Sequence, residues 1–131
     1  MNAIHFRVEG LPRPSADVGA SVRRGRAHVY DKGTAEGWKQ AVWAEALKHR
    51  PAKPIEGAVI IMMSFALPRP KTATRLRHDR KPDWENLVKP VQDVLTKLGY
   101  WSDDCQIDEA SVSKYYADAE AGPGVTVDIQ W

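Results

Sequence analysis

Four acids and one lysine cluster around one predicted helix: Asp83, Glu85, Lys89, Asp103 and Asp104. Asp83 precedes the helix, where the backbone is still extended, so the carboxylates of Asp83 and Glu85 can point to one side. The positive partial charge of a helix N-terminus favours ionised carboxylates there. Carboxylates and water form an all-oxygen site, which suits Mg²⁺ or Mn²⁺ better than Zn²⁺. Such a site predicts activation of water for attack on a phosphodiester.

Lys89 fits the same chemistry, because its ammonium can stabilise the oxyanion that develops during cleavage. Asp104 is the residue that is hardest to place in the same metal site. A helix of about 15 residues is ~22 Å long, which puts Asp104 at the far end from Asp83. The site therefore closes only if the chain doubles back after Gly99, or if a second copy of the chain completes it.

The same residues also have an ordinary interpretation. Glu85, Lys89 and Asp93 lie four residues apart, and such exposed pairs stabilise a helix by only ~0.2–0.5 kcal/mol each. Asp83 alone is typical of a helix cap, and an adjacent Asp pair is typical of a turn. Other polar positions of the helix are expected to form a solvated face: Asp93, Thr96 and Lys97.

An apolar stripe marks the helix: Trp84, Leu87, Val88, Val91, Val94, Leu95 and Leu98. Asp83 is a suitable N-cap and Gly99 a suitable C-terminal stop. Pro90 cannot donate a hydrogen bond to the Asn86 carbonyl, so we expect a kink after the second turn. Trp84 is expected in the core, and Trp101 either packs or stacks on an opened base.

The rest of the chain supplies a sheet and a second helix. We expect strands over residues 4–8, 57–67, 110–116 and 124–131, a short strand near 27–30, and a helix over 34–50. The run 57–67 is apolar throughout, which predicts a buried central strand. The sum is an α+β domain over residues 1–131, with a mixed sheet of about four or five strands and two main helices.

Composition narrows the class of protein. The chain has 131 residues, 43% of them hydrophobic and 27% charged, which is typical of a globular domain. No apolar run approaches the ~20 residues that span a bilayer, and the first residues lack the apolar region of a signal peptide. Cys105 is the one cysteine, so no internal disulfide is expected. We therefore expect a cytoplasmic protein without membrane contact.

Charge is distributed unevenly along the chain. Residues 1–81 hold 16 Lys/Arg against 7 Asp/Glu, whereas residues 82–131 hold 3 against 10. This asymmetry predicts a polyanionic partner for the basic part, although two solvated faces would have the same composition. Two basic loops are expected to follow the phosphates of DNA through Arg23, Arg24, Arg26, Arg69, Lys71, Arg75, Arg77, Arg80 and Lys81.

The stretch "KPDWENLVKPVQDVLTKLGYWSDDCQI" resembles the signature of the RusA family of Holliday-junction resolvases. The matching positions are Asp83, Glu85, Asn86, Lys89, Asp93, Trp101, Asp104 and Gln106. The resemblance implies a homodimeric, Mg²⁺-dependent endonuclease that makes paired nicks in four-way or branched DNA. It implies metal-binding carboxylates at Asp83, Glu85 and Asp104, a catalytic lysine at Lys89, and a secondary ligand or orienting residue at Asp103.

Two features depart from the family pattern. Glu85 stands where the family commonly has Asp, so the metal preference of the site can differ. The first basic loop, "LPRPSADVGASVRRGRAH", lacks the compact basic run expected there.

Two alternatives to a junction resolvase share part of this pattern. A nuclease of the restriction-endonuclease type needs an acid and a Lys separated by one residue, whereas Glu85 and Lys89 are separated by three. A non-catalytic protein that binds DNA junctions is the second alternative. It would keep the basic loops and leave every strand intact at any Mg²⁺ concentration.

Overall fold

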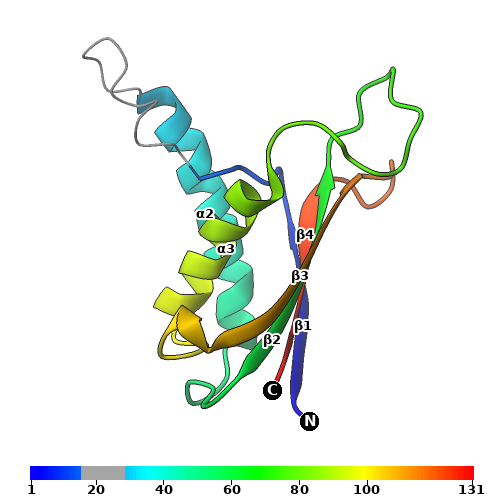
Figure 1. Ribbon diagram of the computed structural model, residues 1–131. Helices are drawn as coiled ribbons and strands as arrows, with labels where there is room; N and C mark the ends of the chain where they lie inside the picture. The colour runs from blue at the N-terminus through cyan, green and yellow to red at the C-terminus, as the bar shows by residue number, and fades with distance from the viewer. Residues whose placement is uncertain (16–28) are drawn as a thin grey trace.

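The computed structural model describes residues 1–15 and 29–131, with side chains described for residues 1–15 and 35–131. Two helices cover one face of a four-stranded sheet (Figure 1). The elements are β1 (Ala3–Glu9), α2 (Val29–His49), β2 (Val59–Leu67), α3 (Trp84–Lys97), the short 3-10 helix η2 (Asp104–Gln106), β3 (Ile107–Tyr116) and β4 (Gly124–Gln130). The predicted α+β class, mixed sheet and two main helices are confirmed.

The strand order is β1-β4-β2-β3. β2 and β3 are parallel, and α3 lies in the connection between them, as a parallel pair requires. β4 is antiparallel to both of its neighbours, β1 and β2. The prediction that β2 is a central strand is therefore confirmed.

Burial in β2 alternates along most of the strand. One face packs against the helices through Val59, Ile61, Met63, Phe65 and Leu67. On the opposite face, Met62 is 39% exposed. The apolar run of β2 is thus buried fully on only one side of the sheet.

α3 continues through Pro90. The Asn86 carbonyl, which loses its helical donor at Pro90, accepts a 2.9 Å hydrogen bond from the Ser15 N–H. The missing helical bond is thereby replaced by a bond from the segment that follows β1. This segment is held against the first turns of α3.

Two sequence expectations are wrong. Val29 and Tyr30 belong to α2 rather than to a short strand, and residues 27 and 28 lie outside the described residues. Strand propensity is a weak prior that depends strongly on context. Trp84 is 56% exposed rather than buried, because it stands in the first turn of α3, at the margin of the core formed by Leu87 and Val91.

In the part of the chain that the structure describes, no helix is long and apolar enough to cross a membrane.

Candidate active site

The chain doubles back after α3. Gly99, at a φ of 80°, donates its N–H to the Thr96 carbonyl at 3.0 Å, and the Tyr100 N–H bonds to the Leu95 carbonyl at 3.1 Å. This pair of bonds is a Schellman motif, which ends the helix and reverses the chain. Gln92 then donates from Nε2 to Oδ2 of Asp104 at 2.9 Å. Asp104 therefore lies beside the second half of α3, not beyond its end.

A capping box fixes the turn that carries Asp104. The Asp103 carboxylate accepts the Cys105 N–H at 2.9 Å, and this hydrogen bond lowers the pKa of Asp103. Gln106 returns a bond from the other side, because its Oε1 accepts the Asp103 N–H at 3.2 Å. Its Nε2 donates to the carbonyls of Ile55 at 2.8 Å and Gly57 at 2.9 Å. The turn is thus joined to the segment that precedes β2.

Glu85, Lys89 and Gln92 lie at i, i+4 and i+7 on α3, so they share one face of the helix. Asp104 contacts this face through Gln92. The Glu85 and Lys89 side chains are exposed. Among the ion pairs of the described residues, none joins Glu85 to Lys89 or Lys89 to Asp93, which removes the support for the ordinary paired row.

Asp83 occupies the N-cap position with extended backbone, at φ −68° and ψ 145°, as predicted. Its side chain makes no capping hydrogen bond to α3; it accepts one from Lys81 Nζ at 2.9 Å. The preceding loop is held from β3, because Lys114 Nζ donates to the carbonyls of Arg80 at 2.7 Å and Pro82 at 2.8 Å. The Asp83 carboxylate therefore lies at the start of α3 but accepts no capping hydrogen bond from the helix.

Within one chain, the two ends of the candidate site stay apart. From Asp83 to Gln92 the helix rises roughly 13 Å at 1.5 Å per residue. Among the described residues, no three Asp, Glu, His or Cys side chains form a group that could hold a metal ion. The donor set of Asp83, Glu85 and Asp104 has the oxygen chemistry that Mg²⁺ requires, but binding one ion through all three needs a rearrangement or a second chain.

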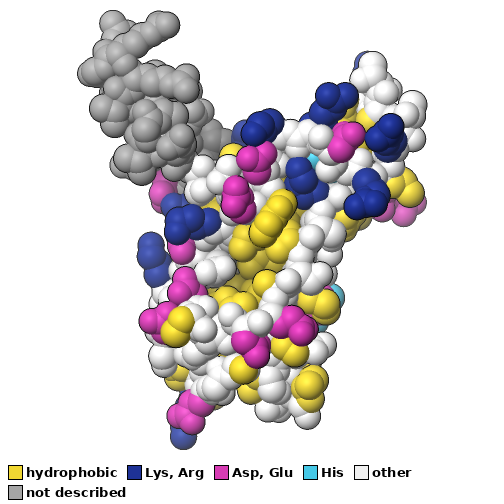
Figure 2. All heavy atoms as spheres, in the orientation of Figure 1, with side chains coloured by type: hydrophobic (Ala, Val, Ile, Leu, Met, Phe, Trp, Pro, Cys, Tyr) yellow, Lys and Arg dark blue, Asp and Glu magenta, His cyan; other side chains and the backbone are white. Residues whose placement is uncertain are grey.

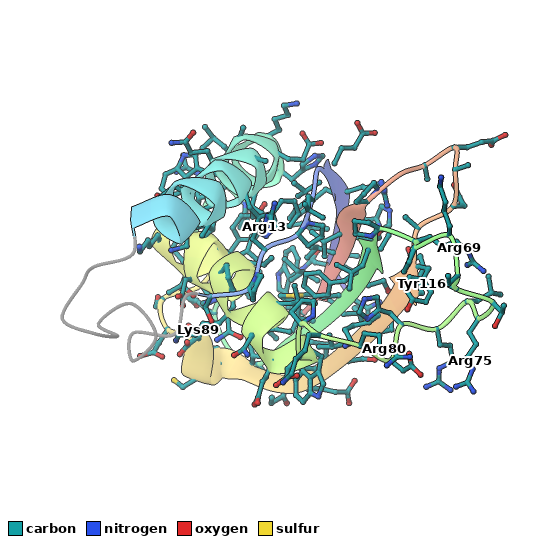
Figure 3. The ribbon with its side chains drawn as sticks, turned by 90° about the horizontal axis from the view of Figure 1, so that it is seen from above. Arg13, Arg69, Arg75, Arg80, Lys89 and Tyr116 are labelled. Carbon is teal, nitrogen blue, oxygen red and sulfur yellow. The ribbon has the colours of Figure 1, made fainter. Side chains whose placement is uncertain are left out.

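The predicted DNA-contacting residues of the second basic loop are all exposed: Arg69, Lys71, Arg75, Arg77, Arg80 and Lys81. Figure 2 shows Lys and Arg side chains gathered at the end of the molecule to which this loop belongs. Seen from that end, Arg69, Arg75 and Arg80 lie around Tyr116, whereas Arg13 and Lys89 lie farther away, toward the helices (Figure 3). Arg23, Arg24 and Arg26 lie outside the described residues.

Trp101 packs in the core, which confirms the first of its two predicted roles and leaves it unavailable for stacking on a base. It is 1% exposed, and its indole Nε1 donates to Thr96 Oγ1 at 2.8 Å. Thr96 is therefore half-buried and bonded, which corrects its expected place on a solvated face. Lys97 is exposed as expected.

Three contacts of the site were missed from the sequence. Gln92 follows Lys89 by three residues, so helical spacing could have placed it in the row. The spacing of Asp103 and Gln106 is that of a capping box and could have predicted the rigid turn. Lys114 gives no such signal, because its partners lie 34 and 32 residues earlier in the chain.

The chain is similar in sequence to known proteins. The sequence model of the family described as Endodeoxyribonuclease RusA matches residues 10–130. The chain is 34% identical over 130 residues to an uncharacterized Bacillus subtilis protein, YqaN, covering 90% of this chain and 91% of YqaN.

Two further relatives carry functional names. A crossover junction endodeoxyribonuclease of Lactococcus phage r1t is 29% identical over 106 residues, covering 78% of this chain and 79% of the phage protein. The crossover junction endodeoxyribonuclease RusA of Escherichia coli strain K12 is 33% identical over 92 residues, covering 70% of this chain and 67% of that protein. The chain belongs to the RusA family of endodeoxyribonucleases.

Proposed function

We propose that this protein is a crossover junction endodeoxyribonuclease that resolves four-way DNA junctions by paired nicks in the cytoplasm. The family match supports the reaction class. The observation that carries the assignment to these residues is the return of Asp104 to α3. It sets a carboxylate on the face that also holds Glu85 and Lys89.

Asp83, Glu85 and Asp104 would hold a divalent metal ion, Mg²⁺ or Mn²⁺. Such an ion, when bound, lowers the pKa of water and neutralises charge on the phosphodiester. Gln92 orients the Asp104 carboxylate, and Asp103 orients the turn that carries it. Lys89, which pairs with no acid among the described residues, would place its ammonium near the phosphate, where it stabilises the developing oxyanion.

A homodimer accounts for two nicks in one junction and for the separation of the acids within one chain. Trp84 supports it, because an indole that is 56% exposed stands between Asp83 and Glu85. Exposed tryptophans of this kind are enriched where proteins associate. In this arrangement the partner subunit, rather than solvent, lies over the start of α3.

Cleavage of an end-labelled four-way junction in Mg²⁺ and in Mn²⁺ tests the function. We expect Asp83→Asn and Lys89→Ala to abolish paired nicking. Asp83→Asn should retain junction binding or tighten it, since a negative charge near phosphates is removed. Equal cleavage of linear duplex would refute junction specificity. Intact strands at every metal concentration would instead identify a junction-binding protein without catalysis.

Mixed dimers test whether the site is shared between subunits. Asp83→Asn and Asp104→Asn chains, each inactive alone, are combined by joint refolding and assayed on the junction. Recovery of cleavage at one of the two strands is expected if the partner supplies Asp104. No recovery in a mixture proven to contain mixed dimers would place all three acids in one chain.

A further inference from the structure

A cavity of about 480 Å³ opens between the segment that follows β1 and the loop that precedes α3. Arg13 comes from the first of these, and Arg80 and Lys81 come from the second. Prolines and Tyr116 supply most of the remaining wall. No Asp or Glu lines the cavity among the residues that the structure describes.

The three cations differ in how far they are neutralised. Lys81 bonds to Asp83 at 2.9 Å, and Arg80 pairs only loosely with Asp79, at 3.7 Å. Arg13 is half-buried, and none of the ion pairs between described residues includes it. A half-buried guanidinium in a cavity without acids favours an anionic ligand, and its planar fork suits two oxygens of one phosphate.

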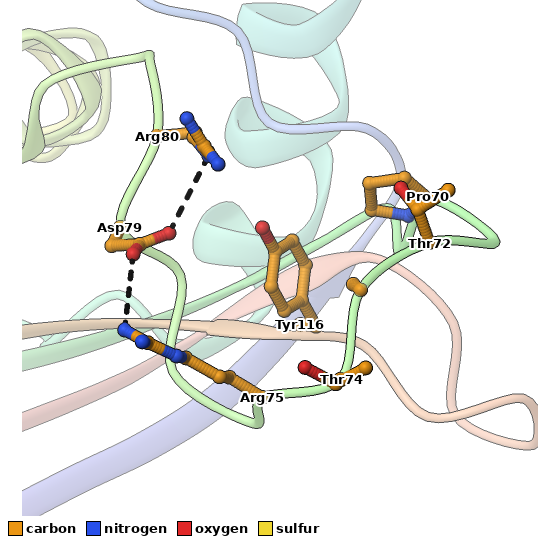
Figure 4. A pocket seen from close by; sticks show the side chains of 8 residues that line it. Pro70, Thr72, Thr74, Arg75, Asp79, Arg80 and Tyr116 are labelled. Atoms are coloured by element: carbon orange, nitrogen blue, oxygen red, sulfur yellow. Dashed lines mark hydrogen bonds and ion pairs between the residues drawn. The ribbon is translucent and has the colours of Figure 1, made fainter.

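A neighbouring cavity of about 260 Å³ differs from the larger one in its charged residues (Figure 4). It shares Arg80 and Tyr116 with the larger cavity, but Asp79 also lines it. Asp79 contacts Arg75 at 3.5 Å and Arg80 at 3.7 Å, so the smaller cavity contains a carboxylate that would repel an anionic ligand. The larger cavity is therefore the better anion site of the two.

The larger cavity adjoins the candidate active site. Pro82, which lines it, directly precedes Asp83. The segment that carries Arg13 is fixed to α3 by the Ser15 N–H bond to the Asn86 carbonyl at 2.9 Å. Both walls are thus anchored within a few residues of Asp83. A volume of about 480 Å³ exceeds that of one phosphate and leaves room for a deoxyribose against the prolines.

We propose that this cavity binds the phosphodiester next to the one that is cut, with Arg13 as its main contact and the adjoining deoxyribose against the proline wall. The proposal rests on the proposed function, since it assigns a position to the DNA strand at the same site. It gives Arg13 a role in placing the scissile phosphate over Asp83.

Single methylphosphonate linkages test it, because each removes one phosphate charge from the DNA without changing the protein. They are placed one at a time at the five linkages on each side of the crossover. We expect one adjacent linkage to weaken binding by wild-type protein roughly tenfold or more, as for a charged hydrogen bond. Arg13→Ala should lose the same affinity on unmodified DNA, and the modification should then have no further effect.

Lys53→Ala is the matched control, because Lys53 is exposed on the loop between α2 and β2 and does not line the cavity. It should change neither the binding nor the pattern across the linkages. Arg13→Lys should recover part of the affinity, and Arg13→Ala should lower the salt dependence of binding by about one phosphate contact.

The outcomes separate this inference from the proposed function. If wild-type protein cuts junctions but every adjacent methylphosphonate acts equally in wild type and Arg13→Ala, the cavity assignment is wrong and the function stands. If wild-type protein cuts no junction, the function is wrong, and the linkage scan of binding still decides whether Arg13 contacts one phosphate.

Discussion

Gln92 and Asp104, twelve residues apart in sequence, are joined by a 2.9 Å hydrogen bond from Nε2 to Oδ2. The bond places a carboxylate on the face of α3 that carries Lys89, although the chain has already left the helix. An amide donor also defines which oxygen of Asp104 stays available for a metal ion. In the proposed site, Gln92 would therefore be a positioning residue that acts through Asp104.

Gln92→Leu should lower junction cleavage about tenfold at limiting Mg²⁺ while leaving junction binding unchanged. Loss of an orienting partner typically costs this much in metal affinity or activity. The measurement is the cleavage rate across a Mg²⁺ titration, where the variant should need more metal. Gln40→Leu, on the exposed side of α2, is the matched control. Equal Mg²⁺ requirements in all three proteins would contradict the role of Gln92.

Lys114→Met should destabilise the protein by about 2 kcal/mol, because two hydrogen bonds from a charged donor are lost. It should also slow cleavage more than it weakens binding, since the carbonyls of Arg80 and Pro82 are released just ahead of Asp83. Urea unfolding and single-turnover cleavage measure the two effects. Lys97→Met removes an exposed lysine from α3 and should leave both quantities near wild type.

Trp101→Phe should lower the free energy of unfolding by about 1 kcal/mol, the typical cost of losing the bond to Thr96. Trp101→Ala should cost about 3–5 kcal/mol, because it also leaves a cavity in the core. Trp43→Phe is the comparison: Trp43 is 41% exposed, and its replacement should change stability little. A Trp101→Ala protein as stable as wild type would contradict the buried position of this indole.

The lowered pKa of His78 should make the stability of the protein depend on pH. Burial, followed by the charge of Lys114, lowers the pKa of His78 from the usual 6.5. The unfolded chain therefore binds a proton more readily than the folded protein, and stability is lost as the pH falls through about 6.5. His78→Phe keeps a ring beside Tyr116, whose centroid lies 4.8 Å away, and should reduce this loss. Urea unfolding at pH 7.5 and pH 5.5 measures it; identical pH dependence in both proteins would refute the assignment.

Much of the fold was predictable because its signals are local. The alternation in β1 and β4, the apolar run of β2 and the stripe of α3 are each fixed by periodicity within one segment. The start of α2 was missed because Val29 and Tyr30 favour strands locally. The exposure of Trp84 was missed because periodicity gives the face of a helix, not where the core ends.

Some residues of the candidate site could likewise be placed from the sequence, and others could not. Asp83, Glu85 and Lys89 were predictable because one helix sets their spacing. The sequence shows that the site needs Asp104 to return to α3, but it does not show that the chain does so. The return depends on the turn at Gly99 and on the hydrogen bonds of Gln106 to the segment before β2. Lys114 depends on the pairing of β3 with β2, which only the tertiary structure fixes.

Pro90 weakens α3 locally but leaves the Asn86 carbonyl free to bind the segment that follows β1. An alanine there would supply its own N–H to the Asn86 carbonyl and make a better helix in isolation. The same N–H would compete with Ser15 for its only described backbone acceptor, loosening the wall that presents Arg13. A substitution that improves α3 would thus release the segment that carries Arg13 from the helix that carries Glu85 and Lys89, while the sheet would stay intact.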